Sequence, residues 1–264
     1  MKIACWIKRR MMFSVIYVLI IFVIARYCAC LLPYYSPAAK CNEYLVAHKN
    51  DDTLRIGFIG DSWAVFYKQY GLGLSNYLEK RLLHPVEVRS SGVCGLTSKE
   101  IYYSMFNVDS IVNIIRWGPD YCVVMAGVND SDRKLGVDYY KENMCLIIDF
   151  LLRNKIVPIV IEIPSYNIRQ SFRIRKPVVR LLYLTSMMVN NSSIDCIDDY
   201  RIGLAHTIQE KQWEQRIIYI RVKDWNPLGY KDERNLYDGI QMHLNSKGYE
   251  VLNHHIAFSI MSDI

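Results

Sequence analysis

The sequence predicts one α/β domain, residues 41–264, with a mostly parallel sheet of five strands and helices on both faces. Two observations lead to this fold class. Five short apolar runs recur along the chain, and segments with the apolar spacing of helices separate them. Strands that alternate with helices of ten or more residues form parallel sheets, because each connecting helix crosses over a face of the sheet.

The predicted strands are the five apolar runs. LRIGFIG at 54–60 is a short apolar run that ends in Gly, which is typical of a buried parallel strand. The remaining strands are expected at VEVRSSG (86–92), YCVVMAG (121–127), IVPIVIEIP (156–164) and RIIYIRV (216–222).

The predicted helices fill the segments between and after these strands. The clearest is 139–154, which combines an apolar stripe with charged residues and good helix formers. The last helix is expected over 246–264, with Ser246 or Asn245 as its N-cap. The other helices are expected over 63–83, 99–107 and 110–118.

The segment before this domain, residues 1–40, has a different composition. Residues 11–25 contain no charge and follow a basic flank, a pattern typical of an export signal or a signal anchor. A transmembrane helix needs roughly 20 apolar residues, so an anchor through residues 11–35 requires Arg26 to extend toward the membrane surface. The sequence therefore predicts an N-terminal transmembrane helix, with cleavage around Cys28 to Cys30 as the alternative.

The same flank predicts where the rest of the chain lies. Positive charge accumulates on the cytoplasmic side of a membrane segment, so the domain is expected outside the cytoplasm, in the periplasm or the extracellular space. Six of the 32 basic residues lie in residues 1–40, which contain no acidic residue, and subtracting these leaves 26 basic against 26 acidic residues. The domain is therefore neutral, which argues against nucleic acid as a partner.

Cysteine and glycine patterns argue against a metal or a cofactor. The eight cysteines form no CxxC pair and no Cys/His cluster with the spacing of zinc ligands. No glycine-rich phosphate loop follows any predicted strand, which argues against a nucleotide-binding protein of the flavodoxin type. The sequence therefore predicts neither a metal site nor a cofactor.

Polar and glycine residues gather where the predicted strands end, and ligands bind at this edge of a parallel sheet. After the first strand, Ser62 begins a helix, where free N–H groups and the helix dipole favour a developing oxyanion. An N-cap role is the alternative for Ser62. After the second strand, small residues around Gly95 allow a backbone N–H to approach a reacting centre. Cys94 beside it is expected to serve in packing.

The third and fourth polar segments complete the set. Asn129 follows the third strand and can present its side-chain NH₂ as an oxyanion donor, although an ordinary turn is the alternative. His243 lies in a loop before the last helix, near Asp238. A His beside a carboxylate can act as the general base of a Ser nucleophile, with the carboxylate fixing its tautomer.

Together the motifs GDS, GVND and HLNSKGY, in this order, resemble the SGNH (GDSL-like) hydrolase family over about residues 54–262. The resemblance implies a flavodoxin-like three-layer α/β/α fold and a serine esterase activity. It implies Ser62 as nucleophile, His243 as general base and Asp238 as the acid that orients it. The implied oxyanion donors are the N–H of Ser62, Gly95 and Asn129.

One departure concerns the acid. The family usually has D-x-x-H, whereas position 240 is Ile and Asp238 lies five residues before His243. A turn or bulge is needed to bring the two side chains together. The alternatives are a Ser–His dyad, or Asp232 or Glu233 as the acid.

The expected reaction is hydrolysis of a carboxylic ester through an acyl-enzyme on Ser62, with O-acetyl groups of envelope glycans as the preferred substrate. A small-molecule ester is the other substrate considered. An O-acyltransferase with the same triad and a non-catalytic membrane-tethered binding protein are the alternatives to the esterase. A basic segment at 169–180 is interpreted as a solvated charged stretch rather than as a basic face for anionic glycans or lipid headgroups, because Pro177 interrupts any single helix there.

Overall fold

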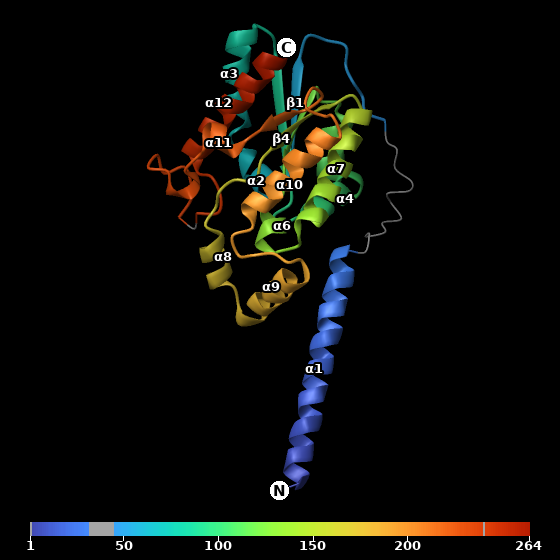
Figure 1. The fold of residues 1–264 in the computed structure, drawn as a ribbon. Helices are drawn as coiled ribbons and strands as arrows, with labels where there is room; N and C mark the ends of the chain where they lie inside the picture. Colours follow the sequence, from blue (N-terminus) through green and yellow to red (C-terminus); the bar gives the residue numbers. More distant parts are fainter. Residues whose placement is uncertain (1, 32–44, 240) are drawn as a thin grey trace.

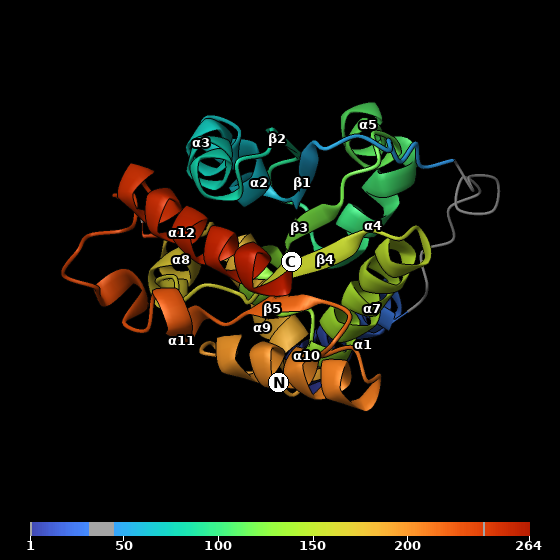
Figure 2. The ribbon, with the colours of Figure 1, turned by 90° about the horizontal axis from the view of Figure 1, so that it is seen from above.

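A computed structural model describes residues 2–31, 45–239 and 241–264, with side chains described from residue 10 to residue 24 in the first of these ranges. It contains a five-stranded sheet with strand order β2-β1-β3-β4-β5. Helices α2, α3 and α12 cover one face of the sheet, and α4, α5 and α7 cover the other (Figures 1 and 2). The predicted α/β fold with a five-stranded parallel sheet is confirmed.

Every strand pairing is parallel. Leu54 lies opposite Val86, and Ile56 lies opposite Tyr121, so the carboxyl ends of the strands share one edge. β5 is shorter than predicted because Val222 already belongs to a helix. The strands are β1 (Leu54–Gly60), β2 (Val86–Gly92), β3 (Tyr121–Met125), β4 (Val157–Ile161) and β5 (Ile218–Ile220).

The predicted helix at 63–83 is two helices. α2 ends at Tyr67 and α3 begins at Gly71, which packs on β2 so closely that an added Cβ would lie 3.1 Å from Val88 Cγ1. The helices on the two faces are α2 (Ser62–Tyr67), α3 (Gly71–Leu82), α4 (Ser98–Asn107), α5 (Asp109–Arg116), α7 (Val137–Arg153) and α12 (Ser246–Asp263).

Several helices were not predicted. Pro177 is the first residue of α9, where its missing N–H costs no hydrogen bond. The helices without a predicted counterpart are α6 (Val128–Asp132), α8 (Ile168–Ile174), α9 (Pro177–Val189), α10 (Ile197–Glu210), α11 (Val222–Trp225) and the short 3₁₀ helix Gly229–Lys231.

The central strands form the core. Phe58 and Ile59 of β1 are fully buried although they point to opposite faces of the sheet, as are Val123 and Val124 of β3. Burial on both faces explains why these strands are continuous apolar runs rather than alternating ones. It also fixes the carboxyl ends of β1 and β3, from which two of the predicted site segments start.

The N-terminal segment forms helix α1 (Lys2–Leu31). Among the residues that the structure describes, no helix is both long enough and apolar enough to cross a membrane. The predicted transmembrane helix is therefore not supported. The location outside the cytoplasm stays a prediction.

Candidate active site

The turn between β1 and α2 places Ser62 at the start of a helix, at the carboxyl edge of the sheet. Gly60 is required there, because a Cβ at this position would lie 2.2 Å from the Met125 carbonyl oxygen of β3. The helix is capped by Asp61, whose Oδ1 accepts a 2.9 Å hydrogen bond from the Trp63 N–H. Asp61 therefore takes the capping role that was the alternative for Ser62, and the Ser62 hydroxyl is left for other contacts.

The hydroxyl of Ser62 contacts the imidazole of His243, which is 181 residues away in the chain. The distance between Ser62 Oγ and His243 Nε2 is 2.9 Å. The ring of Phe66, on α2, packs edge-on against the imidazole with its centroid 4.9 Å away. This is the geometry in which a base can take a proton from a nucleophile.

Asp238 lies on the other side of the imidazole. Its Oδ2 is 3.4 Å from His243 Nδ1. A tight turn closes the five-residue spacing: the Asp238 N–H donates to the His243 carbonyl at 2.8 Å, and the Gln241 N–H donates to the Asp238 carbonyl at 2.9 Å. Asp238 Oδ1 also accepts from the N–H of Met242 at 3.2 Å. The turn therefore brings the predicted acid to the predicted base.

The alternative acids are placed elsewhere. Asp232 forms a two-oxygen contact with Arg234, which lowers the pKa of the carboxyl through hydrogen bonding. Glu233 is exposed, and no ion pair joins it to His243 within the described part of the chain. Of the acids considered, Asp238 is thus the one whose carboxylate reaches the imidazole.

The loop that carries His243 is held by Asn245. Its Nδ2 donates to the carbonyls of Asn235 at 2.6 Å and Tyr237 at 2.9 Å, and its Oδ1 accepts from the Gly248 N–H at 3.1 Å. Asn245 is thus the N-cap of α12 and at the same time crosslinks the loop. The sequence indicated the cap, but the bonds across the loop depend on the tertiary fold.

Burial sets the protonation of the base. Desolvation lowers the pKa of His243 below its ordinary value, and the nearby Asp238 carboxylate opposes this shift without cancelling it. A lowered pKa leaves the imidazole neutral at neutral pH, which is the form that accepts a proton.

Two of the predicted oxyanion donors are backbone N–H groups without a partner in the described part of the chain. Within the described residues, neither the Ser62 N–H nor the Gly95 N–H donates a hydrogen bond. Gly95 adopts φ +83°, a left-handed conformation that favours glycine, and its carbonyl accepts a 2.6 Å bond from Arg133 Nη2. Arg133 thus fixes the Gly95 peptide, a contact that the sequence did not predict. Cys94 is exposed, so its predicted role in packing is wrong.

Asn129 has other partners than expected. Its Nδ2 donates to Asp61 Oδ2 at 2.9 Å and to the Leu96 carbonyl at 2.9 Å, which uses both amide protons. The amide thereby joins the α2 turn to the loop that contains Gly95. Burial raises the pKa of Asp61 to about 7, with the Trp63 N–H and Asn129 bonds opposing the shift and the charge of Asp130 adding to it.

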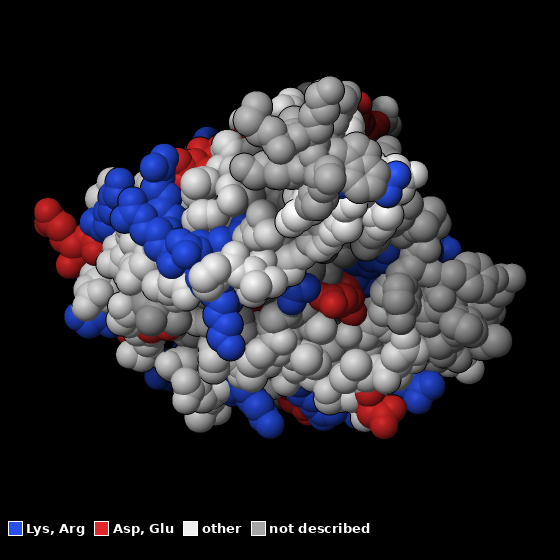
Figure 3. Space-filling view, turned by 90° about the horizontal axis from the view of Figure 1, so that it is seen from below, with Lys and Arg blue, Asp and Glu red and all other residues white. Residues whose placement is uncertain are grey.

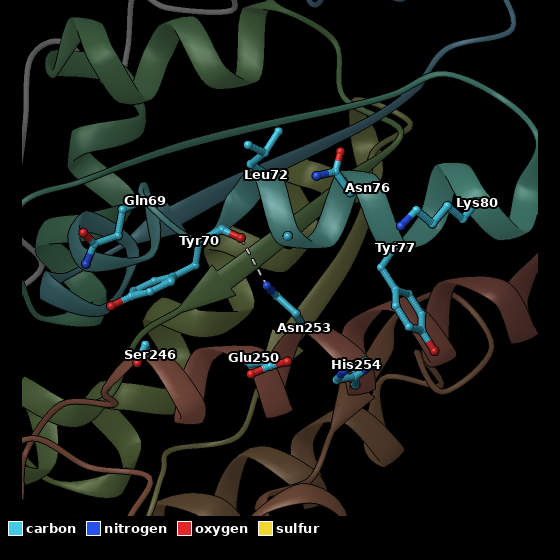
Figure 4. Close-up of a pocket in the computed structure, with 11 residues that line it drawn as sticks. Gln69, Tyr70, Leu72, Asn76, Tyr77, Lys80, Ser246, Glu250, Asn253 and His254 are labelled. Carbon is cyan, nitrogen blue, oxygen red and sulfur yellow. Dashed lines mark hydrogen bonds between the residues drawn. The ribbon is translucent and has the colours of Figure 1, made fainter.

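A groove of about 610 Å³ runs between α3 and α12, and Ser62, Asp238 and His243 are not among the residues that line it (Figure 4). Ser246, three residues after His243, lines it together with Tyr70, which stacks on Tyr249 with ring centroids 4.6 Å apart. Figure 4 shows Tyr70 and Ser246 toward one end and Tyr77 toward the other. The described side chains that line it and make no hydrogen bond within the protein include Gln69, Asn76 and Glu250.

No group of three or more His, Cys, Asp or Glu side chains in the described part of the chain is arranged to hold a metal ion.

Comparison with solved structures gives the same fold. A lipase/acylhydrolase from Enterococcus faecalis is 21% identical, with a TM-score of 0.53 over 79% of this chain and 96% of that one. An acetylxylan esterase from Geobacillus stearothermophilus is 16% identical, with a TM-score of 0.53 over 78% and 94%. A psychrotrophic esterase from a Pseudoalteromonas species is 14% identical, with a TM-score of 0.52 over 80% and 98%.

No curated protein matches the sequence. The GDSL-like lipase/acylhydrolase family matches residues 58–251, which include Ser62, Gly95, Asn129, Asp238 and His243. This span is most of the domain. The chain therefore belongs to the GDSL-like lipase/acylhydrolase family and is a hydrolase that acts on ester bonds.

Proposed function

We propose that this protein is a serine esterase that forms an acyl-enzyme on Ser62. The observation that carries the proposal is the 2.9 Å contact between Ser62 Oγ and His243 Nε2, with Asp238 3.4 Å from the opposite ring nitrogen. His243 takes the hydroxyl proton as Ser62 attacks the ester carbonyl, and it returns the proton to the leaving alcohol. Water then hydrolyses the acyl-enzyme with His243 again as base.

The free N–H groups of Ser62 and Gly95 are the proposed donors to the tetrahedral oxyanion. Asn129 is the proposed third donor, and one of its amide protons has to leave the Leu96 carbonyl for this role. The N-terminus of α2 adds a positive dipole end at the same place.

The proposed substrate is an O-acetyl ester on a glycan. The groove between α3 and α12 supports this, because tyrosine rings and neutral or charge-balanced polar side chains suit a sugar's apolar faces and hydroxyls. Lys80 and Glu250 both line the groove, so it carries no strong single-sign charge. Two acetylxylan esterases are among the solved structures with the same fold.

The test of the catalytic proposal is p-nitrophenyl acetate hydrolysis by the wild type and Ser62→Ala. We expect the substitution to lower kcat by at least about 10³-fold, because the oxyanion donors alone give only a small part of the rate. Ser259→Ala, on α12, is the matched control, since Ser259 Oγ donates only to the His255 carbonyl of its own helix. Equal activity of Ser62→Ala and wild type contradicts the proposal.

The substrate proposal has a separate test. Tyr77→Ala removes an aromatic ring from the groove without touching Ser62 or His243. We expect KM for acetylated xylan to rise about 3- to 10-fold while kcat/KM for p-nitrophenyl acetate stays the same, because contacts of an aromatic ring of this kind are worth about 0.5–1.5 kcal/mol. Tyr102→Ala, on α4 on the opposite face of the sheet, is the control. An unchanged KM for the glycan with full esterase activity contradicts the glycan proposal alone.

A further inference from the structure

Helix α9 exposes an apolar stripe to solvent while it buries two hydroxyl side chains. Its Thr185 and Ser186 side chains are buried against the domain. Four of its aliphatic side chains nevertheless point to solvent, with Val178 70% exposed, Leu181 52%, Leu184 43% and Met188 78%. These four recur at intervals of three or four residues and so share one face.

Exposed large apolar side chains are ordinary when they are scattered, but a continuous stripe on one helix needs a reason. Ile174, the last residue of α8, extends the stripe and is 67% exposed. Removing such a stripe from water is favourable, because the gain grows with the apolar area that is buried. The face is therefore suited to an apolar contact outside the domain.

The same segment carries only positive charge. Residues 163–194 contain five basic residues and no Asp or Glu. Two of the five are paired within the domain, Arg169 with Asp195 and Arg175 with Asp132, and they attach α8 and its C-terminal cap to the domain. The other three, Arg173, Lys176 and Arg180, form no ion pair within the described part of the chain.

These two sets of residues define the α9 face: the apolar Ile174, Val178, Leu181, Leu184 and Met188, and the basic Arg173, Lys176 and Arg180. The helix lies at the lower end of the domain in Figure 1, and the view from below shows Lys and Arg side chains gathered in one area of that surface (Figure 3). A basic rim beside an apolar stripe is the pattern of a helix that lies in a membrane interface.

A second helix with the same character contacts the first. Helix α1 packs against α9. Its described apolar side chains, from Met11 to Ile24, are mostly exposed, and residues 1–42 contain six basic residues and no acidic one. Apolar surface without negative charge thus continues from one helix to the other.

We propose that the α9 face docks on the surface of a lipid bilayer that contains anionic lipids. The apolar stripe enters the boundary between headgroups and acyl chains, and Arg173, Lys176 and Arg180 contact lipid phosphates. A second copy of the chain is the weaker partner for this face, because a symmetric contact brings two basic rims together with no carboxylate between them. The sequence interpretation of this segment, a solvated charged stretch, is the alternative that the experiment below tests.

Docking also places the esterase site relative to the bilayer. α6 and α8 follow the carboxyl ends of β3 and β4, and the Asp132–Arg175 ion pair joins them. The α9 face therefore lies on the side of the sheet where Ser62 lies, and the bilayer is next to the catalytic edge rather than behind it.

The test is co-sedimentation of the full-length protein with vesicles of phosphatidylcholine, alone or mixed with about one-third phosphatidylglycerol. The triple variant Arg173→Gln, Lys176→Gln and Arg180→Gln is expected to bind the mixed vesicles roughly 100-fold more weakly, because each basic group near an anionic surface contributes about fivefold. Its binding to pure phosphatidylcholine is expected to be unchanged. Raising the salt concentration is expected to weaken only the wild type's preference for the mixed vesicles.

A matched triple variant, Lys68→Gln, Lys211→Gln and Lys247→Gln, changes the net charge equally at exposed positions elsewhere in the domain. We expect it to bind both kinds of vesicle like the wild type. If both triple variants lose binding alike, only net charge matters and the proposal is overturned.

The apolar stripe is tested by Leu181→Asp with Met188→Asp, with Leu72→Asp on α3 as the control because Leu72 is similarly exposed. The double variant is expected to lose binding to both kinds of vesicle, and the control to keep it. In the wild type, hydrogen exchange over 177–189 is expected to slow on mixed vesicles, while exchange over 197–210 stays the same. Unchanged exchange, or a stripe variant that abolishes self-association and leaves vesicle binding intact, overturns the proposal.

Discussion

At the scale of single residues, the site depends on a neutral imidazole. Desolvation lowers the pKa of His243 below its ordinary value, and the imidazole must be unprotonated to act as base. We expect kcat/KM for p-nitrophenyl acetate to fall on the acid side with a midpoint below 6.5, the ordinary pKa of His. A pH–rate profile with its acid midpoint above 6.5 would contradict this account of the site.

The Asp238 carboxylate raises the pKa of His243 and so opposes the effect of desolvation. Removing this carboxylate should therefore shift the pKa of His243 in a known direction. Asp238→Asn takes away the negative charge that favours the imidazolium. We expect the acid midpoint to move to lower pH and kcat to fall by on the order of 10²–10⁴, because the imidazolium formed in the transition state loses its counter-charge. Asp232→Asn, which breaks the contact with Arg234, is the control and is expected to leave the midpoint in place. A purely structural role for Asp238 would lower activity without moving the midpoint.

The side-chain amide of Asn129 has partners within the protein in addition to its proposed role as an oxyanion donor. Its amide joins Asp61 to the Leu96 carbonyl, so it positions two loops whether or not it also donates to the oxyanion. We expect Asn129→Ala to lower kcat by on the order of 10²–10³ with little change in KM, since an oxyanion donor acts in the transition state. A rise in KM with unchanged kcat would show that Asn129 acts on substrate binding instead.

At the scale of elements, the start of α12 fixes the position of His243. A Cβ at Gly248 would lie 2.3 Å from the Leu236 carbonyl oxygen, which belongs to the backbone of the loop before His243. We expect Gly248→Ala to displace this loop, lower kcat and lower the thermal unfolding temperature. Gly73, in α3, has an ordinary backbone conformation and room for a methyl group. Gly73→Ala is therefore expected to raise the free energy of unfolding by about 0.5–1 kcal/mol, because Ala favours the helix over the unfolded chain. Thermal unfolding is thus expected to show that the same change, Gly to Ala, destabilises the protein at position 248 and stabilises it at position 73.

At the scale of the whole molecule, two buried carboxyls make folding depend on pH. Burial raises the pKa of Asp61 to about 7 and that of Asp130 to about 6, both above the ordinary 3.8. A carboxyl whose pKa is raised in the folded protein stabilises the fold fully when the pH is below 3.8, its pKa in the unfolded chain. This stabilisation is lost as the pH rises through the pKa of the folded protein. These two groups therefore lower the free energy of unfolding as pH rises from 4 to 8.

Urea unfolding between pH 5 and pH 8 measures this effect. In the wild type, Asp61 and Asp130 are expected to make the free energy of unfolding fall over this range, against the opposite contribution of His243. Asp61→Asn is expected to flatten the pH dependence, because Asn does not titrate. A pH dependence identical to that of the wild type would show that Asp61 is ionised in the folded protein across the range.

The sequence by itself determined the sheet and the ends of its strands. LRIGFIG and YCVVMAG are continuous apolar runs because both faces of β1 and β3 are buried, and this local pattern is visible without a structure. Ser62 was found because it follows the first predicted strand in the GDS motif, and His243 because the HLNSKGY motif places it just before the last predicted helix. The helices from α8 to α10 were not found, since their apolar residues do not all face the core.

Tertiary structure decided what depends on contacts between distant residues. The turn from Asp238 to His243 closes through backbone hydrogen bonds that residue spacing does not specify. Both amide protons of Asn129 are used by atoms 68 and 33 residues away, and Arg133 fixes Gly95 across 38 residues. The outward aliphatic stripe of α9 is likewise a result of the tertiary fold, which buries Tyr183, Thr185 and Ser186 on the other side of the helix. Local patterning encodes burial and periodicity, whereas the choice of partner depends on which elements the fold brings together.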